Sequence, residues 1–182
     1  MFTKAAKQGI KAAFNWTTRN DAANSQAMFP NEPIKNTSGV DRWVSRLNGN
    51  LISHWNCVFN RYSGFCIGSG NTLPTENDYF LENQITTNFS MSIVDVRRGL
   101  DSNNKMYMEI NLIVVNTGST NLVVREIGVV SNSIQTVASA SATAAGNTDI
   151  LIDRSILDSP ITIEPTMAGA IIYRITSDNS FI

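Results

Sequence analysis

The stretch of sequence that most constrains the fold covers residues 106–130 and reads MYMEINLIVVNTGSTNLVVREIGVV. From residue 106 to residue 114 every second side chain is apolar, so one row can face a core while the other faces water or a neighbour. The polar residues 116–121 favour turn geometry, and a second β-branched run follows them at 122–130. This pattern predicts a β-hairpin.

In the second half of this stretch the apolar residues change phase between Val124 and Ile127. A regular ladder would bury Glu126 beside Val124, and burying an unpaired charge is costly. We therefore predict a β-bulge at Arg125 and Glu126, which turns both charged side chains outward and keeps the apolar residues in the core.

The chain has 182 residues, enough for one sizeable core, and its formal net charge is −1. This charge gives no general electrostatic reason to bind nucleic acid or a membrane. The charge is uneven, because residues 1–50 carry seven basic against three acidic side chains, and residues 51–182 carry seven against twelve. No run reaches the roughly 18 apolar residues of a membrane span, and no apolar stretch follows the N-terminal lysines. We therefore expect no signal peptide and assembly in a cytoplasm.

The N-terminus predicts a short amphipathic helix that Thr3 can cap. Its apolar stripe would consist of Phe2, Ala6, Ile10, Ala13 and Phe14, opposite a polar stripe of Lys4, Lys7, Gln8 and Lys11. Residues 15–38 are polar and aperiodic, which predicts an extended arm. We expect residues 1–38 to form an arm ordered mainly by neighbouring subunits, ahead of one domain at 39–182. Binding of the basic helix to a membrane is the less favoured alternative.

Residues 39–48 predict a second short helix, because Val40, Val44 and Leu47 recur at helical spacing. A serine cap precedes this segment, and an Asn-Gly pair ends it. Trp43 is expected on or beside the buried face of this helix.

Residues 51–67 change to a β pattern, in which a tight turn at residues 61–62 places Cys57 opposite Cys66. Because nothing indicates secretion, two buried thiols are favoured over a disulfide. His54 is the only histidine, and no spacing supplies the partners of a catalytic triad or a metal site. We interpret it as structural.

The most specific stretch is residues 67–82, IGSGNTLPTENDYFLE. Its glycines suggest a phosphate loop, but the third glycine, the Lys-Ser/Thr pair and the helix pattern of such loops are missing. The string instead resembles a turn of tailed-bacteriophage structural proteins, which consists of a strand, G-S/T-G-N/T-T, one or two prolines, then two variable residues and D-Y-x-L-E. Residues 116–128 resemble their N-T-G-S-x-x-L/I-x-I/V-x-E-I-G, and residues 151–163 their L-x-D-R-x-x-L-D-x-P-x-T-I. The resemblance implies a non-enzymatic virion component that forms symmetric oligomers with itself and other virion proteins.

The chemistry of this loop also predicts a contact surface without the resemblance. Gly68 and Gly70 permit positive φ, a proline fixes a turn, and Asp78 can bond nearby amides. We expect the loop to dock on its own domain or on a neighbour through Leu73, Tyr79 and Leu81. Its acidic residues would repel a phosphate, and their spacing matches no EF-hand, so calcium binding is the less favoured alternative.

The remaining segments complete a mainly β pattern. Residues 89–96 predict a strand whose apolar phase changes after Ile93 and which two arginines end. Residues 131–148 lack an apolar row and predict a mobile excursion. Strands are expected within 150–163, with a phase slip, and at the closing segment 171–175. We predict a β-sandwich of jelly-roll or immunoglobulin-like type with a short N-terminal helical arm.

No carboxylate has a nucleophile, a histidine or a second acid at motif spacing, so we expect no enzyme, no cofactor and no metal. The expected function is that of a neck, tail or head-vertex protein of a tailed phage, located in the virion. The alternative is a carbohydrate- or host-surface-binding module that stacks sugars on Trp16, Trp43, Trp55 and the tyrosines. The expected interaction residues are Phe2, Ile10, Phe14, Leu73, Tyr79 and Leu81.

Overall fold

The computed structural model describes residues 2–8, 31–44, 63–131, 135–142 and 145–176. Several predictions concern residues outside these ranges, namely Ile10 and Phe14 of the N-terminal helix, the turn at 61–62, and the side chains of His54, Cys57, Trp16 and Trp55.

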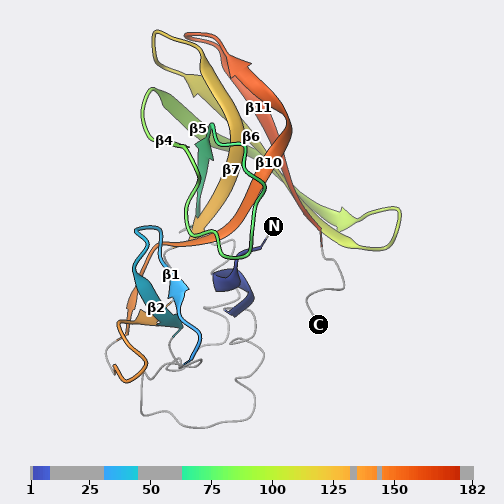
Figure 1. The fold of residues 1–182 in the computed structure, drawn as a ribbon. Helices are drawn as coiled ribbons and strands as arrows, with labels where there is room; N and C mark the ends of the chain where they lie inside the picture. Colours follow the sequence, from blue (N-terminus) through green and yellow to red (C-terminus); the bar gives the residue numbers. More distant parts are fainter. Residues whose placement is uncertain (1, 9–30, 45–62, 132–134, 143–144, 177–182) are drawn as a thin grey trace. The chain divides into compact units, whose positions relative to one another are not determined.

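The chain is mainly β, and its strands form three antiparallel sheets (Figure 1). The sheets have the strand orders β1-β2-β8-β9, β10-β7-β3-β4 and β11-β6-β5. The strands are β1 (Ile34–Lys35), β2 (Asp41–Val44), β3 (Ser63–Gly68), β4 (Gln84–Ile85), β5 (Phe89–Leu100), β6 (Met106–Asn116), β7 (Leu122–Ser131), β8 (Gln135–Val137), β9 (Ala145–Asn147), β10 (Ile150–Ile163) and β11 (Ala168–Thr176). The chain forms two compact units, which we call unit 1 (Met1–Ile85 with Arg125–Asp158) and unit 2 (Thr86–Val124 with Ser159–Ile182).

The predicted hairpin of residues 106–130 is wrong, although both of its strands exist. β6 pairs on its two sides with β5 and β11, whereas β7 belongs to the sheet of β10 and β3. A strand has only two edges, and those of β6 are taken by other strands. In unit 2 the buried side chain of Asn116 organises the connection instead: its amide donates to the carbonyl oxygens of Thr120 and Ile163, at 2.8 and 2.9 Å, and its Oδ1 accepts from the Gly118 N–H.

β5 is longer than predicted, because it continues through the two arginines that were expected to end it. Its register against β6 shifts at Val94, which is the extra residue of a β-bulge. As a result Ile93, opposite Leu112, and Val96, opposite Ile110, lie on the same face of the sheet. The phase change in this part of the sequence is therefore resolved by a bulge.

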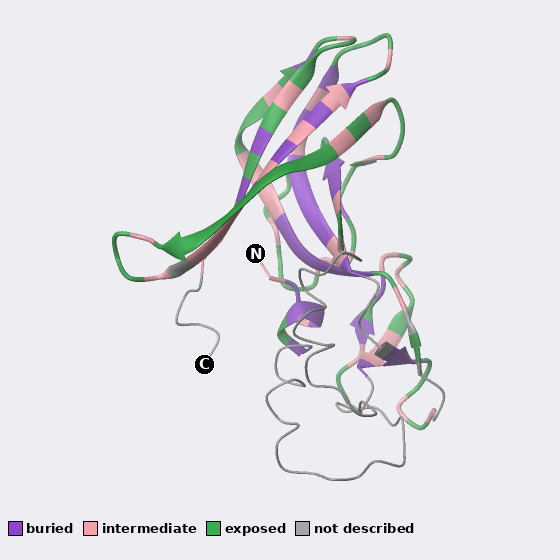
Figure 2. Ribbon diagram, turned by 180° about the vertical axis from the view of Figure 1, so that it is seen from behind, coloured by how far each residue is buried: buried purple, intermediate pink, exposed green. Residues whose placement is uncertain are grey.

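The bulge predicted at Arg125 and Glu126, with both charges outward, is wrong. The β3–β7 ladder stays in register from the pair Ser63–Ser131 to the pair Gly68–Glu126. Glu126 keeps the phase of Val124 and is buried, with 0% of its surface exposed. After residue 125 both faces of β7 are largely buried (Figure 2).

Of the predicted N-terminal helix the structure describes residues 4–8, which are helical, and Thr3 caps them by accepting the N–H of Ala6 at 3.2 Å. Gln8, expected on the polar stripe, is buried and donates to the Glu32 carbonyl. The described parts of the predicted arm make these contacts within unit 1. Thr3 also donates its backbone N–H to Ile152 at 3.0 Å.

The helix predicted at residues 39–48 is wrong where the structure describes it, because β2 occupies Asp41–Val44. β2 pairs with β1 and with β8, which places Trp43 opposite Val137. Val44 is buried, but Val40 is half exposed, so the helical spacing does not form one buried row.

The excursion predicted at residues 131–148 contains strands in its described part, since β8 and β9 pair there in antiparallel fashion. The strands expected within 150–163 are one continuous strand, β10, which runs through Pro160. The predicted closing strand is confirmed as β11, and its alternating row buries Ile171 and Tyr173.

Candidate functional site: a loop held by buried charges

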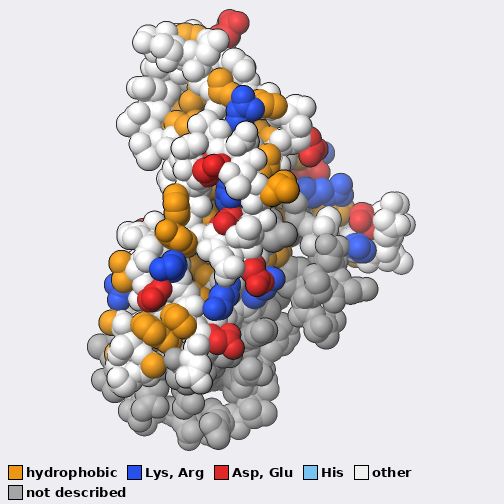
Figure 3. All heavy atoms as spheres, in the orientation of Figure 1, with side chains coloured by type: hydrophobic (Ala, Val, Ile, Leu, Met, Phe, Trp, Pro, Cys, Tyr) orange, Lys and Arg blue, Asp and Glu red, His pale blue; other side chains and the backbone are white. Residues whose placement is uncertain are grey.

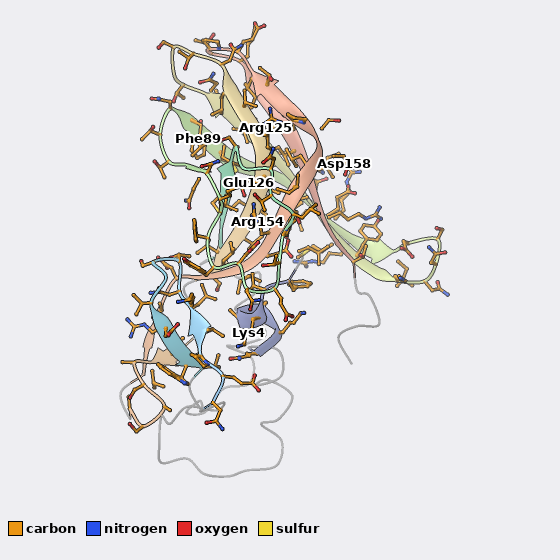
Figure 4. The ribbon with its side chains drawn as sticks, viewed as in Figure 1. Lys4, Phe89, Arg125, Glu126, Arg154 and Asp158 are labelled. Carbon is orange, nitrogen blue, oxygen red and sulfur yellow. The ribbon has the colours of Figure 1, made fainter. Side chains whose placement is uncertain are left out.

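The candidate site is built around Arg154 in β10, whose surface is only 3% exposed. Its Nε donates to Oε2 of Glu126 in β7, and its Nη1 donates to Oδ2 of Asp78, both at 2.8 Å. Its Nη2 lies 3.7 Å from Oε2 of Glu82. Figure 4 shows the side chains of Glu126 and Arg154 directed toward one another. We call these four residues the Arg154 cluster.

Glu126 holds the two ends of the loop 69–83 together. Its Oε1 accepts the backbone N–H groups of Gly70 and Asn83, at 3.0 and 2.9 Å. Its Oε2 accepts the N–H of Glu82 at 3.2 Å in addition to Arg154. A buried carboxylate needs a counter-charge and hydrogen bonds, and this one has both. This is why β7 can bury the charge instead of forming the predicted bulge.

Two further carboxylates shape the loop itself. Glu82 accepts the N–H groups of Asn71 and Thr72, both at 2.9 Å, and the Thr72 hydroxyl at 2.6 Å. Asp78 accepts the N–H and the hydroxyl of Thr75, at 3.0 and 2.8 Å. Hydrogen bonds to Glu126 therefore connect the two ends of the loop, and hydrogen bonds to Glu82 and Asp78 fix the residues between them.

The two glycines of the motif serve close packing rather than positive φ, which among the described glycines only Gly39 adopts. A Cβ on Gly68 would lie 2.4 Å from Oε1 of Glu126, and a Cβ on Gly70 would lie 2.6 Å from the same atom. The expectation of positive φ at these positions is wrong. The glycines are required because the carboxylate of Glu126 reaches the backbone there.

The electrostatic interactions within the Arg154 cluster favour the charged forms of Asp78, Glu82 and Arg154. Burial alone would raise the pKa of Asp78, but hydrogen bonds from Arg154 and Thr75 outweigh burial and lower this pKa below its usual value. Burial alone would lower the pKa of Arg154, but Asp78 and Glu126 raise it. Hydrogen bonds from Thr72 lower the pKa of Glu82.

On its apolar side the loop is anchored by Leu81, which is 1% exposed and packs with Cys66, Leu151 and Val130. Burial and the nearby charge of Glu126 raise the pKa of the Cys66 thiol to about 12. The cysteine therefore acts as a small apolar side chain at this position.

On its other side the loop presents apolar residues to the surface. Leu73 is 78% exposed and Phe80 is 44% exposed. The ring of Phe80 lies 4.6 Å from that of Tyr79, and the Tyr79 ring lies 5.7 Å from Nζ of Lys35. Val40, in the neighbouring β1–β2 connection, is also exposed. Apolar side chains are visible over the β1 and β2 region in Figure 3.

The expected interaction residues differ in their placement. Leu81 is buried within its own chain, Tyr79 is partly buried, and Leu73 is exposed. Phe2 is partly buried and forms an isolated β-bridge with Asp153. The N-terminal segment also touches the loop, because Nζ of Lys7 lies 2.8 Å from Oε2 of Glu76. The structure thus brings the N-terminal turn and the loop together in unit 1.

The charges of the Arg154 cluster hold the backbone of the loop. Each carboxylate of the Arg154 cluster accepts hydrogen bonds from backbone amides of the loop. Within the described ranges, no group of three or more His, Cys, Asp or Glu side chains is arranged to hold a metal ion.

The sequence reasoning missed Arg154 and the buried state of Glu126. A signal for both was present, because each is a charged residue inside a strand rich in apolar residues and each belongs to a motif of the resemblance. Two opposite charges of this kind could have been paired with one another.

Comparison of the chain with protein-family models, with curated proteins and with solved structures finds no match. In the described part of the chain, no helix is long and apolar enough to cross a membrane.

Proposed function

We propose that this chain is a non-enzymatic structural component of a tailed-bacteriophage virion, located at the neck, the tail or a head vertex. It assembles there as a symmetric oligomer, through its β-domain and its N-terminal arm, and contacts other virion proteins. Assembly takes place in the host cytoplasm. We further propose that the strands form a β-sandwich of jelly-roll or immunoglobulin-like type.

The observation that supports this proposal is that charged residues from all three sequence motifs contact one another and hold the same loop. Asp78 and Glu82 of the first motif, Glu126 of the second and Arg154 of the third meet in one cluster. All four stabilise a surface loop. A catalytic motif would instead aim such residues at a ligand.

A loop that is fixed from inside and apolar outside fits a binding surface. Its conformation is set before a partner arrives, so less conformational entropy is lost on binding. Exposed Leu73 and Phe80 then supply contact area. Such a surface suits repeated contacts between copies in a particle.

The second candidate is a carbohydrate- or host-surface-binding module. The adjacent rings of Tyr79 and Phe80 favour it, because exposed aromatic rings can stack on sugars. Phe80→Ala would abolish sugar binding in this case. In the structural case it would weaken assembly and leave no sugar-binding signal to lose.

The test uses particles of a tailed phage that encodes this chain. Purified virions are analysed by mass spectrometry and by electron cryomicroscopy. We expect the chain at a fixed copy number set by a closed symmetry, with Leu73 and Phe80 in contact with a neighbouring subunit. Purified virions that lack the chain, while infected cells contain it, would refute the proposal.

A further inference from the structure

The third sheet has an exposed edge at β5. Within the described ranges β6 pairs with one side of β5, and no strand pairs with the other. β5 is exposed along nearly its whole length (Figure 2). Its exposed apolar side chains are Ile93, Val94, Val96 and Leu100, which are 54%, 58%, 42% and 60% exposed. A long edge strand that exposes apolar side chains is a template for pairing with another strand.

We propose that this edge pairs with β5 of a second copy of the chain. The two strands run antiparallel about a two-fold axis at Val96, so that two three-stranded sheets become one continuous sheet. This inference rests on the proposed function only for the premise that copies of the chain meet.

The charges on β5 select this register. Directly opposite residues in an antiparallel pair lie on the same face, and like charges placed opposite one another are destabilising. A two-fold axis at Asp95 would place this carboxylate opposite Asp95 of the second copy. An axis at Arg97 or at Arg98 would in the same way place that arginine opposite its own copy. An axis at Val96 instead places Asp95 opposite Arg97 of the second copy, and does so twice.

The side chains on both faces of β5 are compatible with this pairing. Oδ2 of Asp95 lies 2.8 Å from Nε of Arg97, and both side chains are exposed. In the dimer this ion pair and its copy would form a group of four alternating charges. Val96 lies on the opposite face, which also carries Arg98, and there it would meet Val96 of the second copy. Ile93 lies on that face too, since both residues are opposite buried positions of β6.

The competing explanation is that the bulge and the charges protect the edge from pairing, which natural sheets often require. The two explanations predict different masses in solution. A protected edge adds no contact between β5 strands, so charge reversal at Asp95 or Arg97 leaves the mass unchanged, whereas self-pairing doubles the mass of 20.0 kDa and depends on these charges.

The experiment measures the mass of the full chain by sedimentation velocity over a series of concentrations. The wild type is expected to form a dimer, or a multiple of it. Asp95→Arg and Arg97→Asp should each weaken association about tenfold, because two attractive pairs become repulsive. A mixture of these two variants should associate again. Each variant alone places like charges opposite one another, whereas one Asp95→Arg chain paired with one Arg97→Asp chain places an arginine opposite an aspartate at both contacts. Ile172→Lys, at an exposed apolar residue of β11, is the matched control and should leave the mass unchanged.

A wild-type chain that stays monomeric would refute the pairing, and so would variants that associate like the wild type. Variants that do not associate when mixed would also refute it. Circular dichroism of each variant shows whether the fold is retained. None of these results decides the proposed function, which depends on whether virions contain the chain.

Discussion

The strongest prediction concerns the pair of Glu126 and Arg154. Arg154→Met removes the guanidinium and leaves a fully buried carboxylate that has lost its counter-charge in β10. Glu126→Gln keeps an acceptor for two of the amides of the loop but places an N–H group against the Nε of Arg154. Breaking a buried ion pair from one side costs about 3–5 kcal/mol. We expect each substitution to lower the free energy of unfolding by an amount in this range.

An exposed pair of the same geometry provides the control. The Nε of Arg97 lies 2.8 Å from Asp95, the distance found for Nε of Arg154 and Glu126, but the side chains are 66% and 45% exposed instead of 4% and 0%. Exposed ion pairs contribute at most about 1 kcal/mol. Measured at a dilution where the chain is monomeric, Arg97→Met should therefore cost no more than that, although it removes a guanidinium just as Arg154→Met does.

The assay is equilibrium unfolding in urea, followed by circular dichroism, for the wild type, the two single variants and the double variant. If the two side chains stabilise each other, the double variant should lose about 2–3 kcal/mol less than the sum of the single losses. Hydrogen exchange adds a local measurement, because the amide of Glu82 donates to the same Oε2 of Glu126 that Arg154 contacts and should lose protection in both single variants.

Two results would refute this reasoning. Equal losses for Arg154→Met and Arg97→Met would show that burial does not determine the contribution of the pair. Losses at Glu126 and Arg154 that simply add would show that the two residues act independently.

Three further predictions concern the same part of the chain. Ile127→Ala should cost about 2–5 kcal/mol because the side chain is buried, whereas Arg125→Ala should stay within about 0.5 kcal/mol, and equal losses in urea unfolding would contradict the assigned burial. Gly70→Ala should cost about 1–3 kcal/mol because its Cβ would lie 2.6 Å from a carboxylate oxygen, whereas Gly64→Ala meets nothing within 4 Å and should be nearly neutral. The lowered pKa of Asp78 means that its contribution is complete above its usual pKa of 3.8 and is lost as the pH falls through the folded-state value. Unfolding measured against pH should therefore show a loss of stability in acid that Asp78→Asn reduces, and identical pH curves would contradict this.

The positions of most strands could be predicted from the sequence, because a period of two reflects burial on one face and depends on neighbouring residues only. Strand pairing could not be predicted in the same way. The apolar rows of β6 and β7 are equally compatible with a hairpin and with membership of two sheets. The choice depends on β11, which lies far along the chain and occupies the edge of β6 that a hairpin would use.

The loop was located correctly as a specific structure, but its internal contacts were not predicted. Its glycines, its proline and its acids indicate a shaped turn, and these are local signals. The reason for Gly70 is not local, because the carboxylate that leaves no room for a side chain there comes from Glu126 in another strand. The helix predicted at residues 39–48 failed for a related reason, since strand pairing with β1 and β8 outweighed local spacing.

The two changes of apolar phase in this sequence have different structural outcomes. In β5 the extra residue Val94 restores the phase, and the charged side chains beyond it stay in water. In β7 the phase is not restored, and Glu126 enters the interior, where Arg154, 28 residues later, and three backbone amides compensate its charge. The cost of an unpaired charge can be computed from one strand alone, but the existence of a partner cannot. A charged residue that interrupts an apolar strand therefore predicts either a bulge or an opposite charge in a second strand. In this chain the opposite charge is found for β7, where the buried Glu126 also accepts hydrogen bonds from the loop 69–83.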